Sequence, residues 1–172
     1  QEYCVPGDTT SCASPVGRWD FEEGKGNNTN DISGNNYNGA LTGGAYWTGG
    51  QKGKAMSFDG TDDYINLGSA SKIGNLTNTF TVSAWVYSTN LTGFHRVIAP
   101  ARTNSANGWA FGTNGSALIL TTYGVKDYLS TSATLALNTW YHVTAVMDSN
   151  NAVTFYINGI KYDTVTHTVA GN

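Results

Sequence analysis

The sequence predicts an all-β protein, a sandwich of two antiparallel sheets. Apolar and polar residues alternate along short runs with a period of two, as strands with one buried face require. Turn-forming residue pairs separate the runs at intervals of about 8–12 residues, which is typical of sandwiches. The chain has 21 glycines in 172 residues and only 12% charged residues, about half of the usual ~25%. Weak charge and abundant glycine agree with many strands joined by tight turns.

Four runs give the clearest strands, and they lie at residues 80–87, 118–120, 140–147 and 153–157. Shorter runs predict strands at 18–22, 56–58, 64–67, 96–99, 109–113, 128–130 and 160–165. Asn-Gly pairs occur at 38–39, 107–108, 114–115 and 158–159, and Asp-Gly at 59–60. Such pairs accept the positive φ of hairpin turns. The clearest hairpin therefore joins 152–157 to 160–165 through Asn158 and Gly159.

Composition excludes three classes of protein. Nine Lys and Arg residues, spread along a chain of net charge −3, do not form the basic patch that nucleic acid requires. A hydrophobic content of 40% is too high for a disordered chain. No apolar run approaches the ~20 residues of a membrane-spanning helix. We therefore expect neither nucleic acid nor membrane spans among its interactions.

Residues 1–16 are predicted to be a separate tail that contains both cysteines, Cys4 and Cys12. A Pro-Gly turn between them favours a disulfide, and two free thiols are the alternative. The chain begins with Gln1 rather than Met, so we expect an upstream segment to have been removed. These features predict a secreted protein that is extracellular or at the cell surface.

Several segments resemble the motifs of the LamG-like jelly-roll domains, which belong to the concanavalin A-like lectin/glucanase superfamily. They are Gly17–Gly24, Asp31–Gly39, Gly53–Tyr64, Phe80–Val86, Trp140–Asp148 and Val153–Gly159. The resemblance implies a concanavalin A-like jelly roll over residues 17–172. Family members continue past the last motif, so it also implies that one or two final strands are missing and a sheet edge is open. A truncated chain is our preferred explanation, and self-assembly through that edge is the alternative.

Catalysis finds little support in the sequence. Glucanases place two carboxylates across one glycosidic bond, and the nearest arrangement is Asp20, Glu22 and Glu23. The segment that contains them resembles the first, non-catalytic strand of the family, so we expect these acids to be solvated edge residues rather than catalytic ones. The three histidines have no partner at metal-ligand spacing, and no Gly-x-Ser-x-Gly elbow occurs. We therefore expect the protein not to be an enzyme.

A structural Ca²⁺ is the expected cofactor. Calcium takes six to eight oxygen ligands, and the loop at residues 31–36 is rich in Asp and Asn. Related domains hold an ion there, which implies Asp31, a carbonyl near Asn36 and Asp59 as ligands. The alternative is an Asx-turn in which Asp31 caps its own loop.

Sugar binding needs exposed aromatic rings beside hydroxyl and amide groups. Asn-rich segments contain such rings, and the predicted ligand-binding residues are Tyr46, Trp47, Trp109 and Tyr123. We expect a non-catalytic extracellular recognition or adhesion module that binds carbohydrate on a glycan or glycoprotein surface. The alternative is the structural head of a surface protein or the subunit of an extracellular filament.

Overall fold

The computed structural model describes residues 14–68, 73, 76, 79–99, 108–122 and 126–166. The chain divides into two compact units, residues 1–70 (unit 1) and residues 71–172 (unit 2). The elements whose bounds the structure describes are all β-strands, and every strand pair among them is antiparallel. The predicted all-β class is confirmed. In the described ranges, no helix is long and apolar enough to cross a membrane.

Unit 1 is built from five short strands in two small sheets. One sheet has the order β1-β2-β5 and the other pairs β3 with β4. The strands are β1 (Asn28–Thr29), β2 (Gly39–Thr42), β3 (Tyr46–Gly49), β4 (Lys54–Ser57) and β5 (Tyr64–Asn66). Gly39 is required in β2 because a side chain there would run into that of Ile65. The loops that connect these short strands contain the hydrogen-bonded carboxylates of the unit, such as Asp31 and Asp59.

The strand predicted at residues 18–22 is wrong. Phe21 has φ of 58°, which interrupts any extended run. Arg18 bonds instead to the loop that follows β1, since its carbonyl accepts from the Ile32 N–H at 2.8 Å and its own N–H donates to Asp31. Segment 18–22 is therefore held by loop contacts rather than by a neighbouring strand.

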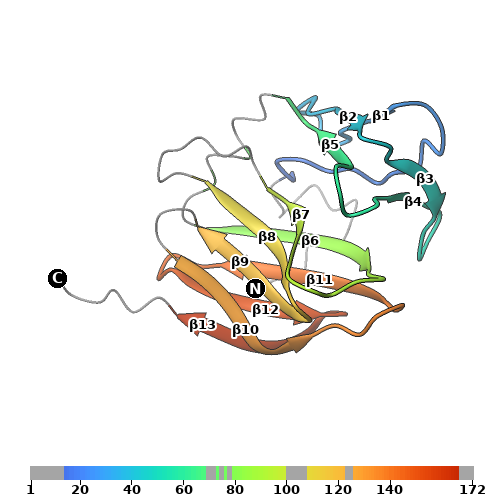
Figure 1. The fold of residues 1–172 in the computed structure, drawn as a ribbon. Coiled ribbons are helices and arrows are strands. Elements are labelled where there is room, and N and C mark those ends of the chain that lie inside the picture. Colours follow the sequence, from blue (N-terminus) through green and yellow to red (C-terminus); the bar gives the residue numbers. More distant parts are fainter. Residues whose placement is uncertain are drawn as a thin grey trace. The chain divides into compact units, whose positions relative to one another are not determined.

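Unit 2 contains two four-stranded sheets, which Figure 1 shows stacked on each other. Their orders are β10-β9-β8-β7 and β13-β12-β11-β6. The strands are β6 (Phe80–Tyr87), β7 (Phe94–Ile98), β8 (Trp109–Asn114), β9 (Ala117–Thr122), β10 (Lys126–Thr134), β11 (Trp140–Met147), β12 (Ala152–Ile157) and β13 (Ile160–Thr166). The predicted hairpin is confirmed as β12–β13, with φ of 51° at Asn158 and 78° at Gly159, the positive values of a type I′ turn.

The core of unit 2 lies between its two sheets. Alternate side chains of β11 and β12, such as Val143 and Phe155, are buried, and so are Phe111 and Leu120 on β8 and β9. At one edge of the sandwich, Ser130 Oγ on β10 donates to the Asp163 carboxylate on β13 at 2.7 Å. The remaining side chains of β6 and β11 alternate with the buried ones, so they point away from the core.

Candidate functional site

The loop after β1 is organised around the carboxylate of Asp31, which is only 8% exposed. Oδ1 accepts from the N–H groups of Arg18 at 3.0 Å and Ser33 at 2.8 Å. Oδ2 accepts from Ser33 Oγ at 2.8 Å and the Tyr37 N–H at 3.0 Å. Desolvation raises the pKa of Asp31, but these hydrogen bonds outweigh it and lower the pKa from 3.8 to about 2. Asp31 is therefore a charged structural cap.

This geometry does not fit calcium at Asp31. Four donors direct their hydrogens at the two carboxylate oxygens of Asp31 and occupy the lone pairs that a cation would need. The contact from the Ser33 N–H is the Asx-turn that was the alternative to a metal. Asn36, with φ of 61°, helps to bend the same loop. These hydrogen bonds favour the Asx-turn over the predicted ligand pair Asp31 and Asn36, which stays a prediction.

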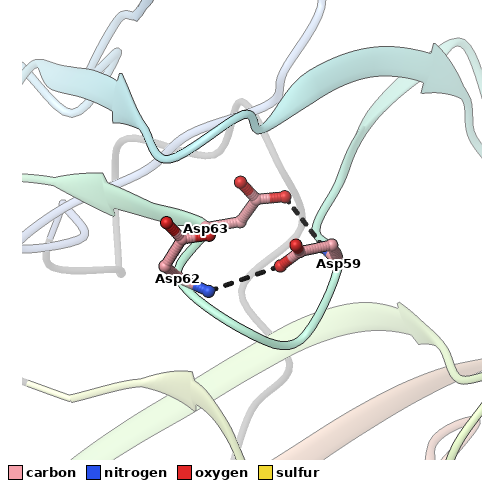
Figure 2. Close-up of side chains that lie close together, drawn as sticks. All are labelled: Asp59, Asp62 and Asp63. Carbon is pink, nitrogen blue, oxygen red and sulfur yellow. Dashed lines mark hydrogen bonds between the residues drawn. The ribbon is translucent and has the colours of Figure 1, made fainter.

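Asp59 belongs to a different group, the acidic turn formed with Asp62 and Asp63 between β4 and β5. Ligand atoms of the three carboxylates lie within 4.8 Å of one another. Figure 2 shows Asp59 accepting from the Asp62 N–H, and Asp63 accepting from the Asp59 N–H at 2.8 Å. Hydrogen bonds, first of all from the Thr61 N–H, lower the pKa of Asp59. Three charged carboxylates on one turn are a donor set that suits a hard cation.

The three acids after Trp19 each have a separate local role. Asp20 pairs with the Arg18 guanidinium at 2.8 Å. Glu22 accepts from the Lys54 N–H at 3.4 Å, and Glu23 accepts from the Asn30 N–H at 2.6 Å. The carboxylates are therefore directed to different backbone and side-chain partners rather than to a shared substrate position.

The predicted sugar-binding aromatics are not brought together. Tyr46 on β3 is 60% exposed, whereas Trp109 on β8 is only 2% exposed. Trp109 was therefore wrongly predicted, since its ring packs on Phe80 at 4.9 Å and its Nε1 donates to the Ile73 carbonyl. Trp47 is half-buried, and its Nε1 donates to the Gly26 carbonyl at 2.7 Å. Tyr123 lies outside the described residues, as do Cys4 and Cys12.

The sequence interpretation missed a group of aromatic rings on the outward face of β6 and β11, here called the aromatic face. Trp85 is 52% and Tyr87 46% exposed. Register places Trp85 opposite His142 and Tyr87 opposite Trp140. The rings of each pair lie 5.4 Å apart, inclined at 57° and 48° respectively. Two rungs about 7 Å apart, the spacing of alternate strand residues, form a short ladder of tilted rings.

Hydroxyl groups continue the aromatic face. The next two rungs place Ser83 opposite Thr144 and Thr81 opposite Val146. Among the described residues of this sheet, the outward positions set by register carry no carboxylate. Burial lowers the pKa of His142, which favours a neutral imidazole near pH 7. The face is therefore nearly uncharged, with rings at one end and hydroxyls at the other.

A signal for the aromatic face was present in the sequence. Thr81 and Ser83 share the period of Trp85 and Tyr87, while Phe80 begins the apolar period that faces the core. Two polar residues on the same face as two aromatics indicate a solvent-facing surface.

Residues 59–172 match the sequence profile of the family described as the concanavalin A-like lectin/glucanases superfamily. The chain belongs to this superfamily. The match includes the acidic turn and the whole of unit 2, and so both the β6–β11 and β8–β9 strand pairs. No curated protein matches the chain in sequence.

Solved structures show the same superfamily fold. The binding domain of Paraclostridial Mosquitocidal Protein 1 matches with a TM-score of 0.63 and 20% identity, over 88% of this chain and 40% of that one. The botulinum neurotoxin serotype C1 binding domain matches with a TM-score of 0.61 and 19% identity, over 89% of this chain and 39% of that one. An S-layer domain-containing protein of Clostridium thermocellum matches with a TM-score of 0.54 and 24% identity, over 90% of this chain and 75% of that one. The chain thus spans about 40% of the matched toxin structures, and at these identities the likeness shows fold alone.

Proposed function

We propose that this chain is a non-catalytic, extracellular recognition module that binds carbohydrate on its aromatic face. The observation that carries the proposal is the exposure of Trp85 and Tyr87 beside His142 and Trp140, on a sheet face whose described outward positions hold no carboxylate. Large apolar rings left in solvent have a cost unless something covers them, and contiguous exposed groups of this kind mark binding sites.

The chemistry of the aromatic face suits a sugar. Each pyranose has apolar C–H faces that stack on aromatic rings and hydroxyls at its rim that exchange hydrogen bonds. Ser83, Thr81 and Thr144 supply hydroxyls beside the rings. Because the face is nearly uncharged, recognition would rest on stacking and hydrogen bonds rather than ion pairs. A neutral oligosaccharide therefore fits better than a strongly anionic one.

Structural neighbours support glycan binding as a use of this fold. Botulinum neurotoxin type C, a structure similar to this chain, depends for cell entry upon interaction with two ganglioside molecules. The botulinum neurotoxin DC binding domain was solved in complex with SialylT and, separately, with rat synaptotagmin II. Those partners belong to the toxins, and a sugar-binding role for this chain rests on its own aromatic face.

A lack of catalysis belongs to the same proposal. The separate contacts of Asp20, Glu22 and Glu23 support it, because paired carboxylates would have to face one bond. For the structural ion we keep Ca²⁺ and assign it to Asp59 with Asp62 and Asp63, since Asp31 has only donors around it. The alternative role is a structural head or the subunit of a filament. One feature favours it: β6 lies at the end of its described sheet, where it can pair with a strand of another chain.

Screening on a glycan array, followed by calorimetry, tests the proposal. The array should carry neutral probes such as cellohexaose and chitohexaose and the anionic probe 3′-sialyllactose. Trp85→Ala should weaken binding at least tenfold, because a central Trp commonly contributes about 2 kcal/mol or more and about 1.4 kcal/mol is tenfold. Phe94→Ala is the matched control, since Phe94 is 56% exposed but lies on β7 in the other sheet.

Two results would contradict the proposal. One is the absence of binding to every glycan tested. The other is binding that survives Trp85→Ala but is lost in Tyr46→Ala, which would place the site on the β3–β4 hairpin of unit 1.

A further inference from the structure

The outer edge of β6 lacks the features that protect the other sheet edges of unit 2. Among the described strands of unit 2, four lie at the end of a sheet, namely β6, β7, β10 and β13. An exposed edge presents unpaired N–H and C=O groups, and proteins shield it with charges, bulges or proline. The sequence and register of each edge strand show which of these devices it has.

Three of the edges are shielded in this way. β7 contains Arg96 and a register shift between Arg96 and Ile98. β10 contains Lys126 and Asp127 and a shift between Leu129 and Thr134. β13 contains Lys161 and Asp163, and its pairing with β12 is also irregular.

β6 has none of these devices. Its eight residues, Phe-Thr-Val-Ser-Ala-Trp-Val-Tyr, include no charge and no proline. It pairs with β11 through eight consecutive residues without a shift. A long, regular, uncharged edge is the kind that accepts another strand.

The core-facing side chains of β6 are less buried than those of its neighbour β11. The core-facing residues Val143 and Ala145 of β11 are each 1% exposed. Their register partners on β6, Ala84 and Val82, are only half-buried, as is Val86. A further strand with apolar residues facing the core would cover these three side chains.

We propose that β6 pairs antiparallel with β6 of a second copy of this chain, which joins two four-stranded sheets into one of eight strands. This interface uses the same strand as the proposed glycan site, because β6 carries Ser83 and Trp85 of the aromatic face, but pairing of the two edges does not depend on glycan binding. Pairing about a two-fold axis at Ala84 keeps every side chain on its own face, because opposed residues then differ by an even number of positions.

The pairing is self-complementary in this register. On the core side, Val82 lies opposite Val86 of the partner subunit. On the outer side, Ser83 lies opposite Trp85 of the partner subunit and Thr81 opposite Tyr87 of the partner subunit. No charges oppose each other, and aromatic rings meet small or β-branched residues, which are favourable cross-strand pairs. The aromatic faces of the two copies would then be continuous.

The test is the mass of the 172-residue protein in solution, by sedimentation from about 10 µM to about 1 mM, because a single strand pair is a small interface and a weak one. We expect the average mass to rise toward twice the chain mass of 18.3 kDa. Ser83→Lys should weaken dimerisation at least tenfold, since the two introduced charges would lie on diagonal positions across the axis. The control is Thr164→Lys, an exposed outward position on β13, at the opposite edge of the same sheet.

Amide hydrogen exchange along β6 gives a second readout. In the dimer, the β6 amides that point away from β11 should exchange at least tenfold more slowly at high concentration than at low concentration. A mass of 18.3 kDa at every concentration, or a dimer unaffected by Ser83→Lys, would overturn the proposal. Concentration-independent protection of these amides would also overturn it, because another part of the same chain would then cover the edge.

Discussion

Replacing Asp31 by asparagine tests whether its carboxylate is the cap of the loop after β1. The change keeps the shape of the side chain and one acceptor oxygen but removes the charge. The amide Nδ2 would take the place of Oδ2, which now accepts from Ser33 Oγ and the Tyr37 N–H. The Tyr37 N–H would then face a second donor and lose its hydrogen bond, whereas the Ser33 hydroxyl can turn and accept from Nδ2.

The expected loss of stability follows from these contacts. Leaving one buried donor, the Tyr37 N–H, unsatisfied costs about 1–3 kcal/mol. We therefore expect Asp31→Asn to reduce the free energy of unfolding by about 1–3 kcal/mol. The lowered pKa agrees with this range. A fall from 3.8 to about 2 corresponds to roughly 2 kcal/mol in favour of the folded, charged form, at about 1.4 kcal/mol per pKa unit.

The same contacts give the protein a pH-dependent stability. The folded pKa of Asp31 lies below its ordinary value, so the folded state binds fewer protons than the unfolded state does. This stabilisation is complete above pH 3.8 and is lost as the pH falls through about 2. The component should be missing in Asp31→Asn, whose unfolding free energy should fall less between neutral pH and pH 2.

Urea unfolding followed by the indole N–H resonance of Trp19 is the assay, because this group donates to the Tyr37 carbonyl at the capped loop. Asp20→Asn is the control. Asp20 is exposed and pairs only with Arg18 among the contacts described for it, so its loss should cost less than about 1 kcal/mol. An Asp31→Asn midpoint equal to that of the unmodified protein would refute the capping role. A loss seen only in the presence of Ca²⁺ would restore the metal hypothesis at Asp31.

Three further outcomes are expected. Asp163→Ala should lower the free energy of unfolding by about 1–3 kcal/mol in urea titrations, because Ser130 would lose its partner across the two sheets; an unchanged midpoint would contradict this. Added Ca²⁺ should raise the melting temperature, because binding to the folded state stabilises it by about 2.7 kcal/mol at a hundredfold excess over Kd, and Asp59→Asn should abolish this rise. Equal melting temperatures in Ca²⁺ and in EDTA would contradict a calcium site at Asp59. Cys4 and Cys12 should resist alkylation in the native protein until reduced, whereas two reactive thiols would exclude the disulfide.

Regular strands with one polar face could be predicted from the sequence. Alternation identified β6, β11 and β12 almost to the residue, because one face of each meets the core and the other does not. β1 to β3 were missed, since strands of two to four residues are too short to show a period. The false strand at 18–22 shows the opposite failure, in which a correct pattern is overruled by loop contacts made by Arg18.

Site residues were harder to predict because exposure depends on contacts distant in sequence. Trp109 is buried against Phe80, 29 positions earlier, and donates to the Ile73 carbonyl, 36 positions earlier, and no local pattern reveals these contacts. Asp31 was predicted as a calcium ligand, with an Asx-turn as the alternative, because the sequence could not separate a cation from four hydrogen-bond donors. Trp85 became a candidate only when the register with β11 placed His142 beside it.

The central claim, that glycans bind the aromatic face, is tested most directly by the five Trp indole N–H resonances. The tryptophans are distributed over the chain as Trp19, Trp47, Trp85, Trp109 and Trp140. Titration of the ¹⁵N-labelled protein with cellohexaose and with 3′-sialyllactose should shift the resonances of Trp85 and Trp140. The buried Trp109 and the unit 1 residues Trp19 and Trp47 should not move. Saturable shifts confined to Trp47, or no shift of any indole with either sugar, would contradict the claim.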